Sequence, residues 1–285
     1  METKNSKQFS TAHPGLIAFV IDQSGSMSLP YPECGTKAKF VHRVVNRAIN
    51  EIINANGDGE TIKDRVFISL FGCGGKNVTA IRTDKLSAYA SSPLRIEKGK
   101  QKMSDGNGGL VEIDTDNPIY FEEVARGVTP LGSALEAVKV VFTGYMEKDP
   151  ESPAPVLIII SDGRPELGSD AADAEEEAKA IHEAQEIMAL TGNDGSPLIF
   201  CCHIGNNAQK CEFPTDESEL ADAQAKFMFK ICSEVPESYM EAAQKQELNI
   251  AEHSKGMVCN ADPTTFIKFI NFGSSAASVE RSCPE

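Results

Sequence analysis

Five residues with oxygen-bearing side chains are spaced so that they could hold one divalent metal ion. Asp22, Ser24 and Ser26 alternate along the segment that follows a strongly apolar run. Asp162 ends a second such run, and Thr129 lies where a helical pattern begins. Carboxylate and hydroxyl oxygens suit a hard cation such as Mg²⁺ or Mn²⁺, and Mg²⁺ takes about six oxygen ligands. These five residues are the predicted metal site.

The mixture of ligand types predicts what such a metal would do. Hydroxyl groups are neutral ligands, so an ion bound directly by Ser24, Ser26 and Thr129 keeps most of its charge. Asp22 and Asp162 would then balance that charge and orient waters and hydroxyls. An ion held in this way still attracts an anionic oxygen, which an Asp or Glu of a protein partner would supply.

The elements around these residues predict a doubly wound α/β fold. Continuous apolar runs indicate buried strands, and apolar residues at helical spacing indicate helices between them. The strands are expected at 16–22, 65–72, 76–83, 155–162, 197–205 and 256–260, and the helices at 39–55, 130–146, 170–190, 217–232, 237–247 and 263–272. Such alternation is typical of a mainly parallel sheet with helices on both faces. In these sheets, ligands bind beyond the carboxyl ends of the strands, where both predicted acids lie.

Two local features are expected to shape the site. Gly25 permits a tight turn between Ser24 and Ser26. Thr129 is predicted as a helix N-cap, with Pro130 at the first helical position.

The order Asp22-x-Ser24-x-Ser26, then Thr129, then Asp162 resembles the metal-ion-dependent adhesion site of von Willebrand factor A (VWA) domains. The resemblance covers roughly residues 16–273. It implies a Rossmann-like, six-stranded sheet with one antiparallel edge, and no catalytic activity of its own. It also implies that the ligand Thr129 is coupled to movement of the final helix.

Two segments point to a subgroup of that family. Thr129–Ala134 (TPLGSA) and Ile160–Glu166 (ISDGRPE) most resemble bacterial cytoplasmic members. These include the VWA domains associated with tellurium resistance, which are often encoded beside a protein kinase and a phosphatase. The resemblance therefore implies a stress or signalling complex in which such a neighbour is a partner.

The pattern along the chain predicts one domain. It spans residues 15–273, after a flexible N-terminus at 1–14 and before a flexible tail at 274–285. The stretch 84–118 is less regular and is expected to form an insertion or hairpin. No internal repeat or low-complexity linker divides the chain.

Composition excludes several kinds of partner. A net charge of −15 argues against nucleic acid and against anionic membrane surfaces, which both need clustered Lys and Arg. The N-terminal residues lack an apolar core like that of a signal peptide, and the most apolar run, Val156–Ile160, is too short to cross a bilayer. A cytoplasmic location and mainly reduced thiols among the eight cysteines are expected.

Two other functions remain open at this stage. A metal-dependent phosphatase or phosphotransferase could also begin from an acid at a strand end, but the position two residues after Asp22 is Ser24, which is a poor general acid. A scaffold whose metal only stabilises the fold is the other alternative.

Two further motifs have simpler explanations. Gly72–Lys76 (GCGGK) is interpreted as a turn, because Leu70 stands where a phosphate loop would begin with glycine. Cys201 and Cys202 are neighbours on a predicted strand and should face opposite ways, so they are not expected to share a metal with His203 and Cys211.

Overall fold

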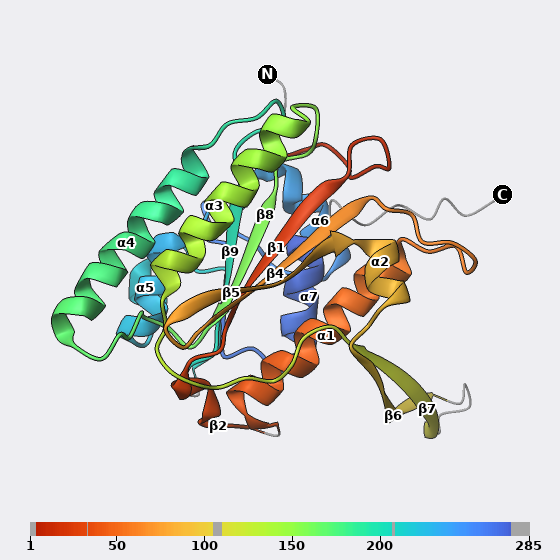
Figure 1. The fold of residues 1–285 in the computed structure, drawn as a ribbon, viewed down its shortest axis with the longest axis horizontal. Coiled ribbons are helices and arrows are strands. Elements are labelled where there is room, and N and C mark those ends of the chain that lie inside the picture. The colour runs from red at the N-terminus through yellow and green to blue at the C-terminus, as the bar shows by residue number, and fades with distance from the viewer. Residues whose placement is uncertain (1–3, 33, 105–109, 207–208, 275–285) are drawn as a thin grey trace.

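The computed structural model describes residues 4–32, 34–104, 110–206 and 209–274, and its core is a seven-stranded sheet (Figure 1). In spatial order the strands are β10 (Cys211–Glu212), β11 (Met257–Cys259), β9 (Leu198–His203), β8 (Val156–Ser161), β1 (Gly15–Asp22), β4 (Val66–Gly74) and β5 (Asn77–Lys85).

The sheet is parallel at its centre and antiparallel at both edges. Neighbouring strands from β11 through β9, β8 and β1 to β4 pair in parallel, whereas β5 and β10 pair antiparallel with β4 and β11. The mainly parallel, doubly wound prediction is confirmed, but six strands with one antiparallel edge is wrong. The extra strand is β10, two residues long, which the apolar pattern could not indicate.

Helices cover both faces of the sheet (Figure 1). One face packs against α1 (Lys37–Ala55) and α7 (Pro263–Gly273), and the other against α3 (Leu131–Lys148), α4 (Asp170–Ala189) and α5 (Ala223–Ile231). Side chains of β1 alternate between the two cores, as strand geometry requires. Ile17, Phe19 and Ile21 face the first, and Leu16, Ala18 and Val20 face the second.

The core beneath α7 is rich in aromatic rings. Phe272 of α7 lies 5.4 to 5.6 Å, between ring centroids, from Phe213, Tyr239 and Phe200. Phe269 lies 5.5 Å from Phe213 and 6.1 Å from Phe200. These five rings form what we call the α7 aromatic cluster, and offset or edge-on contacts of this kind add to the stabilisation from burial.

The remaining elements are the hairpin strands β6 and β7, of ten residues each, and several short strands and helices. They are η1 (Gly25–Ser28), β2 (Pro30–Tyr31), β3 (Gly35–Thr36), α2 (Leu86–Ser91), β6 (Arg95–Ser104), β7 (Leu110–Ile119), η2 (Glu217–Glu219), η3 (Glu237–Tyr239) and α6 (Met240–Lys245). The helix expected at 217–232 is thus split into η2 and α5, because Asp222 caps a new helix with its side chain. The helix expected at 237–247 becomes η3 followed by α6.

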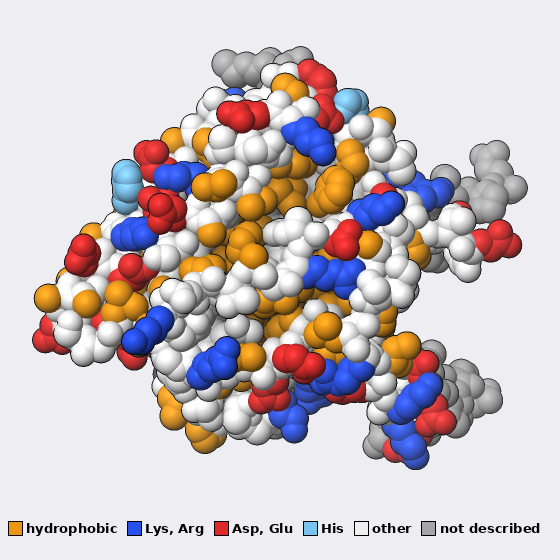
Figure 2. Space-filling model, in the orientation of Figure 1, with side chains coloured by type: hydrophobic (Ala, Val, Ile, Leu, Met, Phe, Trp, Pro, Cys, Tyr) orange, Lys and Arg blue, Asp and Glu red, His pale blue; other side chains and the backbone are white. Residues whose placement is uncertain are grey.

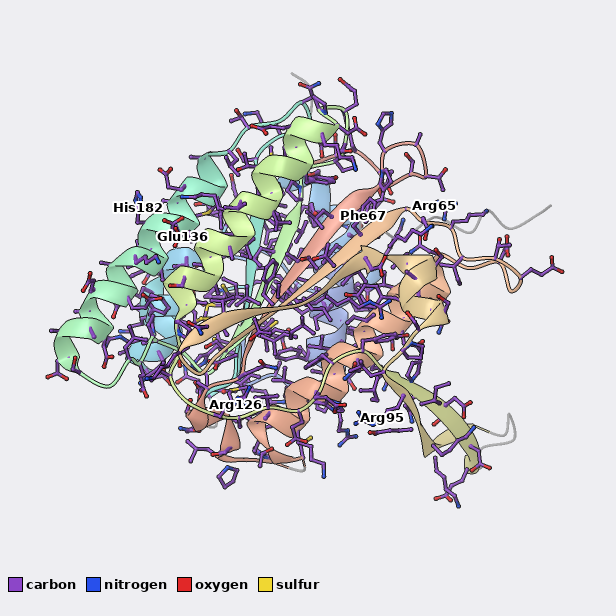
Figure 3. The ribbon with its side chains drawn as sticks, viewed as in Figure 1. Arg65, Phe67, Arg95, Arg126, Glu136 and His182 are labelled. Carbon is purple, nitrogen blue, oxygen red and sulfur yellow. The ribbon has the colours of Figure 1, made fainter. Side chains whose placement is uncertain are left out.

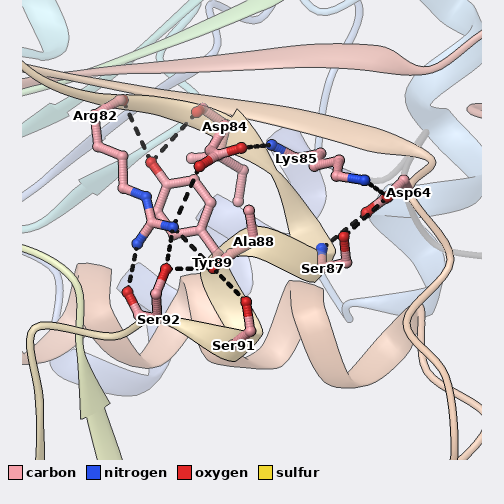
Figure 4. A network of polar contacts seen from close by, with 10 residues as sticks. Asp64, Arg82, Asp84, Lys85, Ser87, Ala88, Tyr89, Ser91 and Ser92 are labelled. Carbon is pink, nitrogen blue, oxygen red and sulfur yellow. Dashed lines mark hydrogen bonds and ion pairs between the residues drawn. The ribbon is translucent and has the colours of Figure 1, made fainter.

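The segment 84–118 contains α2 and the hairpin formed by β6 and β7, which projects beyond α1 in Figure 1. A polar network ties α2 to strand β5 (Figure 4). The Arg82 guanidinium donates to the carbonyl oxygens of Ala88 and Ser92, both at 2.8 Å, and lies 4.1 Å from the centre of the Tyr89 ring. Ser87 and Lys85 both contact the Asp64 carboxylate.

Residues before β1 contact the domain, although the sequence indicates a flexible segment there. The amide groups of Ser6 and Lys7 both donate to one oxygen of the Asp194 carboxylate at 2.9 Å. Phe9 is buried against Gly15, where an added Cβ would lie 2.4 Å from the ring. The predicted tail at 274–285 lies outside the described residues apart from Ser274.

The surface viewed in Figure 2 has Lys, Arg, Asp and Glu spread around its periphery, with hydrophobic side chains gathered nearer the centre, over the sheet. Within the described residues no helix is long and apolar enough to cross a membrane.

Candidate metal centre

The two predicted acids meet at the carboxyl edge of the sheet. Strands β1 and β8 are parallel neighbours in which Ile21 pairs with Ile160, so Asp22 and Asp162 follow at the same end. Figure 3 helps to locate this edge: Arg65 precedes β4 at the opposite end, whereas the backbone of Arg126 donates to Gln23 beside Asp22.

A chain of hydrogen bonds joins four of the five predicted residues. The Ser24 amide donates to Oδ1 of Asp22 at 2.8 Å, and the Ser24 and Ser26 hydroxyls lie 3.0 Å apart. The Ser26 hydroxyl in turn donates to Oδ1 of Asp162 at 3.0 Å. Side chains from two separate loops therefore direct oxygen atoms into one small region.

Asp22 carries a charge that its surroundings oppose. It is only 2% exposed. Burial, and then the Asp162 carboxylate, raise the pKa of Asp22 to about 6, although hydrogen bonds from Ser161 and Ser24 act in the other direction. Two carboxylates close together and largely out of water favour either a proton or a cation between them.

Thr129 is buried on a loop that is bonded to both acidic loops. The Thr129 amide donates at 2.9 Å to the carbonyl oxygen of Glu166, which lies four residues after Asp162. On the other side, the Gly25 amide donates to the Gly127 carbonyl oxygen at 3.0 Å. Within the described part of the chain, the Thr129 hydroxyl makes no hydrogen bond with the other four predicted residues. Thr129 is thus linked to the other predicted ligands only through backbone hydrogen bonds.

The prediction that Thr129 caps α3 is wrong. The N-cap is Pro130, which makes no side-chain capping bond, and the helix begins at Leu131. Pro130 has a ψ of 62°, which is not helical, so α3 begins one residue later than the capping pattern predicts.

Glycines allow the loops at this edge to pack closely. A Cβ on Gly127, whose φ is +73°, would lie 2.4 Å from the Cα of Gly75, and a Cβ on Gly25 would lie 3.3 Å from the Gly127 carbonyl oxygen. Gly25 also begins η1, and the Met27 amide donates to the Ser24 carbonyl at 3.1 Å, which closes the tight turn expected there. The interpretation of Gly72–Lys76 as a turn holds only for Gly75 and Lys76, because Gly72–Gly74 are the last residues of β4 and pair with β5. Gly72 and Gly74 lie against Gln23, where an added Cβ would come within 2.2 and 2.5 Å of it.

Two contributors were not found from the sequence. Ser161, the last residue of β8, donates its hydroxyl to Oδ2 of Asp22 at 2.6 Å. Lys37, the first residue of α1, is 1% exposed and places its ammonium group 2.8 Å from Oδ2 of Asp162. Ser161 follows Ile160, the partner of Ile21, and so lies beside Asp22 on the neighbouring strand; that pairing could have indicated Ser161, whereas no local pattern indicates Lys37.

The donor chemistry fits a hard divalent ion better than a soft one. Two carboxylates and three hydroxyls supply only oxygen atoms, which Mg²⁺ and Mn²⁺ favour. Among the described residues no group of three or more His, Cys, Asp or Glu could hold a metal, so a site here depends on its hydroxyl ligands.

The nearby cysteines do not form a competing site. Cys201 packs toward α4 and α5 and Cys202 toward α7, so the expectation that they face opposite ways is confirmed. The seven described cysteines are free thiols, and the eighth, Cys283, lies outside the described residues. Cys211 lines a small cavity with His203 and Cys259.

Comparison with known proteins gives only structural likeness. No protein-family model matches the sequence, and no curated protein matches it. A von Willebrand factor type A protein from Catenulispora acidiphila has a TM-score of 0.42 and 14% identity, over 96% of this chain and 48% of its own. The PilB minor pilin from Streptococcus sanguinis has a TM-score of 0.49 and 10% identity, over 100% and 64%.

A third solved structure is of similar length to this chain. The vWF domain of the type V pili tip protein Mfa5 from Porphyromonas gingivalis has a TM-score of 0.43 and 10% identity, over 92% of this chain and 95% of its own. The chain spans about half of the Catenulispora protein and just under two thirds of PilB. At these scores the functional argument rests on the residues of this chain.

Proposed function

We propose that this chain is a VWA-type, metal-dependent protein-binding module. The observation that carries the proposal is the hydrogen-bonded line from Asp22 through Ser24 and Ser26 to Asp162. It gathers oxygen ligands from two loops around a buried carboxylate that lacks a balancing cation. In this proposal one Mg²⁺ or Mn²⁺ is held by Ser24, Ser26 and Thr129, with the two carboxylates balancing its charge.

The partner in this proposal is a protein that offers an Asp or Glu side chain. Neutral hydroxyl ligands leave the ion attractive to one more anionic oxygen, and the carboxyl edge of an open parallel sheet is where such a ligand would approach. The chain binds rather than turns over its partner, because Ser24 stands where a phosphatase would need a second acid.

The biological setting in this proposal is a bacterial cytoplasmic stress or signalling complex. Its support is the resemblance of TPLGSA and ISDGRPE, at 129–134 and 160–166, to VWA proteins associated with tellurium resistance. The free thiols of the seven described cysteines agree with a reducing compartment. A kinase or phosphatase encoded beside the gene is then the first partner to test.

Thr129→Val provides the sharpest test, because it keeps the side-chain shape and removes the hydroxyl. Titration calorimetry with Mg²⁺ on chelator-stripped protein should show one weak site, and the variant should bind about tenfold more weakly or worse. The free energy of unfolding should change by less than about 1 kcal/mol, since no capping bond is lost. Thr143→Val, in the second half of α3, is the matched control and should bind Mg²⁺ normally.

Three results would separate this proposal from its alternatives. Absence of binding at millimolar Mg²⁺ and Mn²⁺ contradicts a metal-dependent module. Chelator-sensitive hydrolysis of a generic phosphoester that is lost in Asp22→Asn favours a phosphatase. Metal binding that raises stability while capture of the neighbouring kinase or phosphatase ignores chelator favours a scaffold with a structural metal.

A further inference from the structure

Lys37 is buried at the candidate metal centre. Its side chain is 1% exposed, and its ammonium group lies 2.8 Å from Oδ2 of Asp162, whose own side chain is 12% exposed. Oδ1 of the same carboxylate accepts the hydrogen bond from Ser26. Both oxygens of Asp162 are therefore engaged by groups of the chain itself.

The position of Lys37 is unfavourable apart from this contact. Removing an ammonium group from water is unfavourable unless a good partner replaces the solvent. Lys37 is also the first residue of α1, directly after the N-cap Thr36, where the positive end of the helix dipole repels a cation. The ion pair with Asp162 is what offsets both effects.

We propose that Lys37 is an internal competitor for the divalent ion at this centre. The inference rests on the proposed function, because it needs the same metal site. Asp162 cannot fully balance both the ammonium group and a metal, so metal binding must weaken the Lys37–Asp162 ion pair or displace the ammonium group. Lys37 thereby sets a high threshold concentration of metal for binding.

Formal charges show why the competition favours an acidic partner. Asp22, Asp162 and Lys37 together carry one negative charge, and a divalent ion turns this into one positive charge. A carboxylate from outside would restore neutrality. Metal and acidic partner should therefore bind with positive cooperativity, and the metal alone should bind weakly.

The test is a Mg²⁺ titration of the full chain, stripped with chelator, by calorimetry and by thermal melting. Lys37→Met removes the charge while filling the same space and should lower the dissociation constant for Mg²⁺ about tenfold or more. Lys39→Met removes an exposed charge two residues further along α1 and should change it less than about twofold. Lys37→Gln, which stays polar, provides a second neutral variant if Lys37→Met folds poorly.

Melting gives an independent readout. In chelator, Lys37→Met should melt below the wild type, because Asp162 loses its partner, and Mg²⁺ should raise its melting temperature more than that of the wild type. Asp162→Asn should remove the Mg²⁺ effect in both backgrounds.

The outcomes are distinguishable. If the wild type binds Mg²⁺ and neither neutral Lys37 variant binds it more tightly, the competition is wrong and the metal site stands. If Lys39→Met tightens Mg²⁺ binding as much as Lys37→Met does, the effect comes from the net charge of the chain and the inference is also overturned. If only the Lys37 variants bind metal, the inference holds and the proposed function of the native chain fails. If no form binds Mg²⁺ or Mn²⁺, both fail.

Discussion

Two buried aspartates occupy opposite ends of the sheet, and their surroundings differ. Asp194, at the amino end, is 5% exposed and accepts three backbone hydrogen bonds, from Ser6 and Lys7 at 2.9 Å and from Ala154 at 3.0 Å. Fixed amide donors thus replace the water that the carboxylate loses on folding. This aspartate joins the N-terminal segment to the start of β8.

Asp22, at the carboxyl end, is buried just as deeply but is less well compensated. It accepts from the Ser24 amide and the Ser161 hydroxyl, and it faces a second carboxylate, Asp162. An aspartate side chain therefore stabilises the fold at the amino end of the sheet, as Asp194, and carries an unfavourable charge at the carboxyl end, as Asp22. Such uncompensated charge in a structured site is a physical sign of function, because a ligand can relieve it.

The largest effect expected from this comparison is at the amino end. Asp194→Ala should lower the free energy of unfolding by about 4 kcal/mol, because it leaves the buried Ala154 amide without a partner and removes three hydrogen bonds to a charge. Urea unfolding followed by circular dichroism measures the change. Asp170→Ala, at an exposed position in the first turn of α4, is the control. A loss below about 1 kcal/mol would contradict the role given to Asp194.

A smaller effect should come from the pH dependence of Asp22. Its pKa is about 6 in the folded chain against 3.8 for the ordinary side chain, so the folded state holds its proton to higher pH than the unfolded state. Stability from this group is therefore present below pH 4 and is lost as the pH rises through 6. The loss amounts to about 3 kcal/mol at most, at about 1.4 kcal/mol for each pH unit.

Asp22→Asn isolates that contribution. Without metal, the variant should gain stability relative to the wild type as the pH rises from 4.5 to 7.5, and the difference should shrink when Mg²⁺ is added to the wild type. Chemical unfolding in chelator across this pH range measures it. A difference that does not vary with pH would show that Asp22 is as well compensated as Asp194.

The smallest effect is expected for Ser161→Ala. Losing the hydroxyl that donates to Oδ2 of Asp22 at 2.6 Å should lower stability by about 1–2 kcal/mol at pH 7.5. The loss should be smaller at pH 5, where a protonated Asp22 needs the donor less. Ser152→Ala, which removes a hydroxyl bonded to Asp149 away from the site, should show no such pH dependence. If Ser161→Ala lowers the free energy of unfolding equally at both pH values, Ser161 does not act by stabilising the charge of Asp22.

The sequence predicts the core of this fold well, because its central strands are buried on both faces. Runs such as 16–22 and 155–162 are continuously apolar and have no competing interpretation, and the structure places β1 and β8 within a residue or so of them. Strand β10 was not predicted, because a strand of two residues shows no periodicity. Its pairing depends on where β11 lies, which is a tertiary property.

The site could be predicted in part for the same reason. Asp22 and Asp162 meet because they end neighbouring parallel strands, which alternation of strands and helices indicates. Lys37 and the contact from Thr129 to Glu166 depend on how loops cross the edge of the sheet, and neighbouring residues do not encode that path. The missed groups are therefore those placed by packing.

The α7 aromatic cluster determines how the final helix could move. A shift of α7 by one helical turn, about 5.4 Å, would draw Phe269 and Phe272 away from the three rings they contact. Interlocked rings do not slide gradually, since intermediate positions lose contacts on one side before gaining them on the other. A shift would then be an all-or-none transition with a kinetic barrier. Aromatic packing around α7 would therefore set the rate of any such shift.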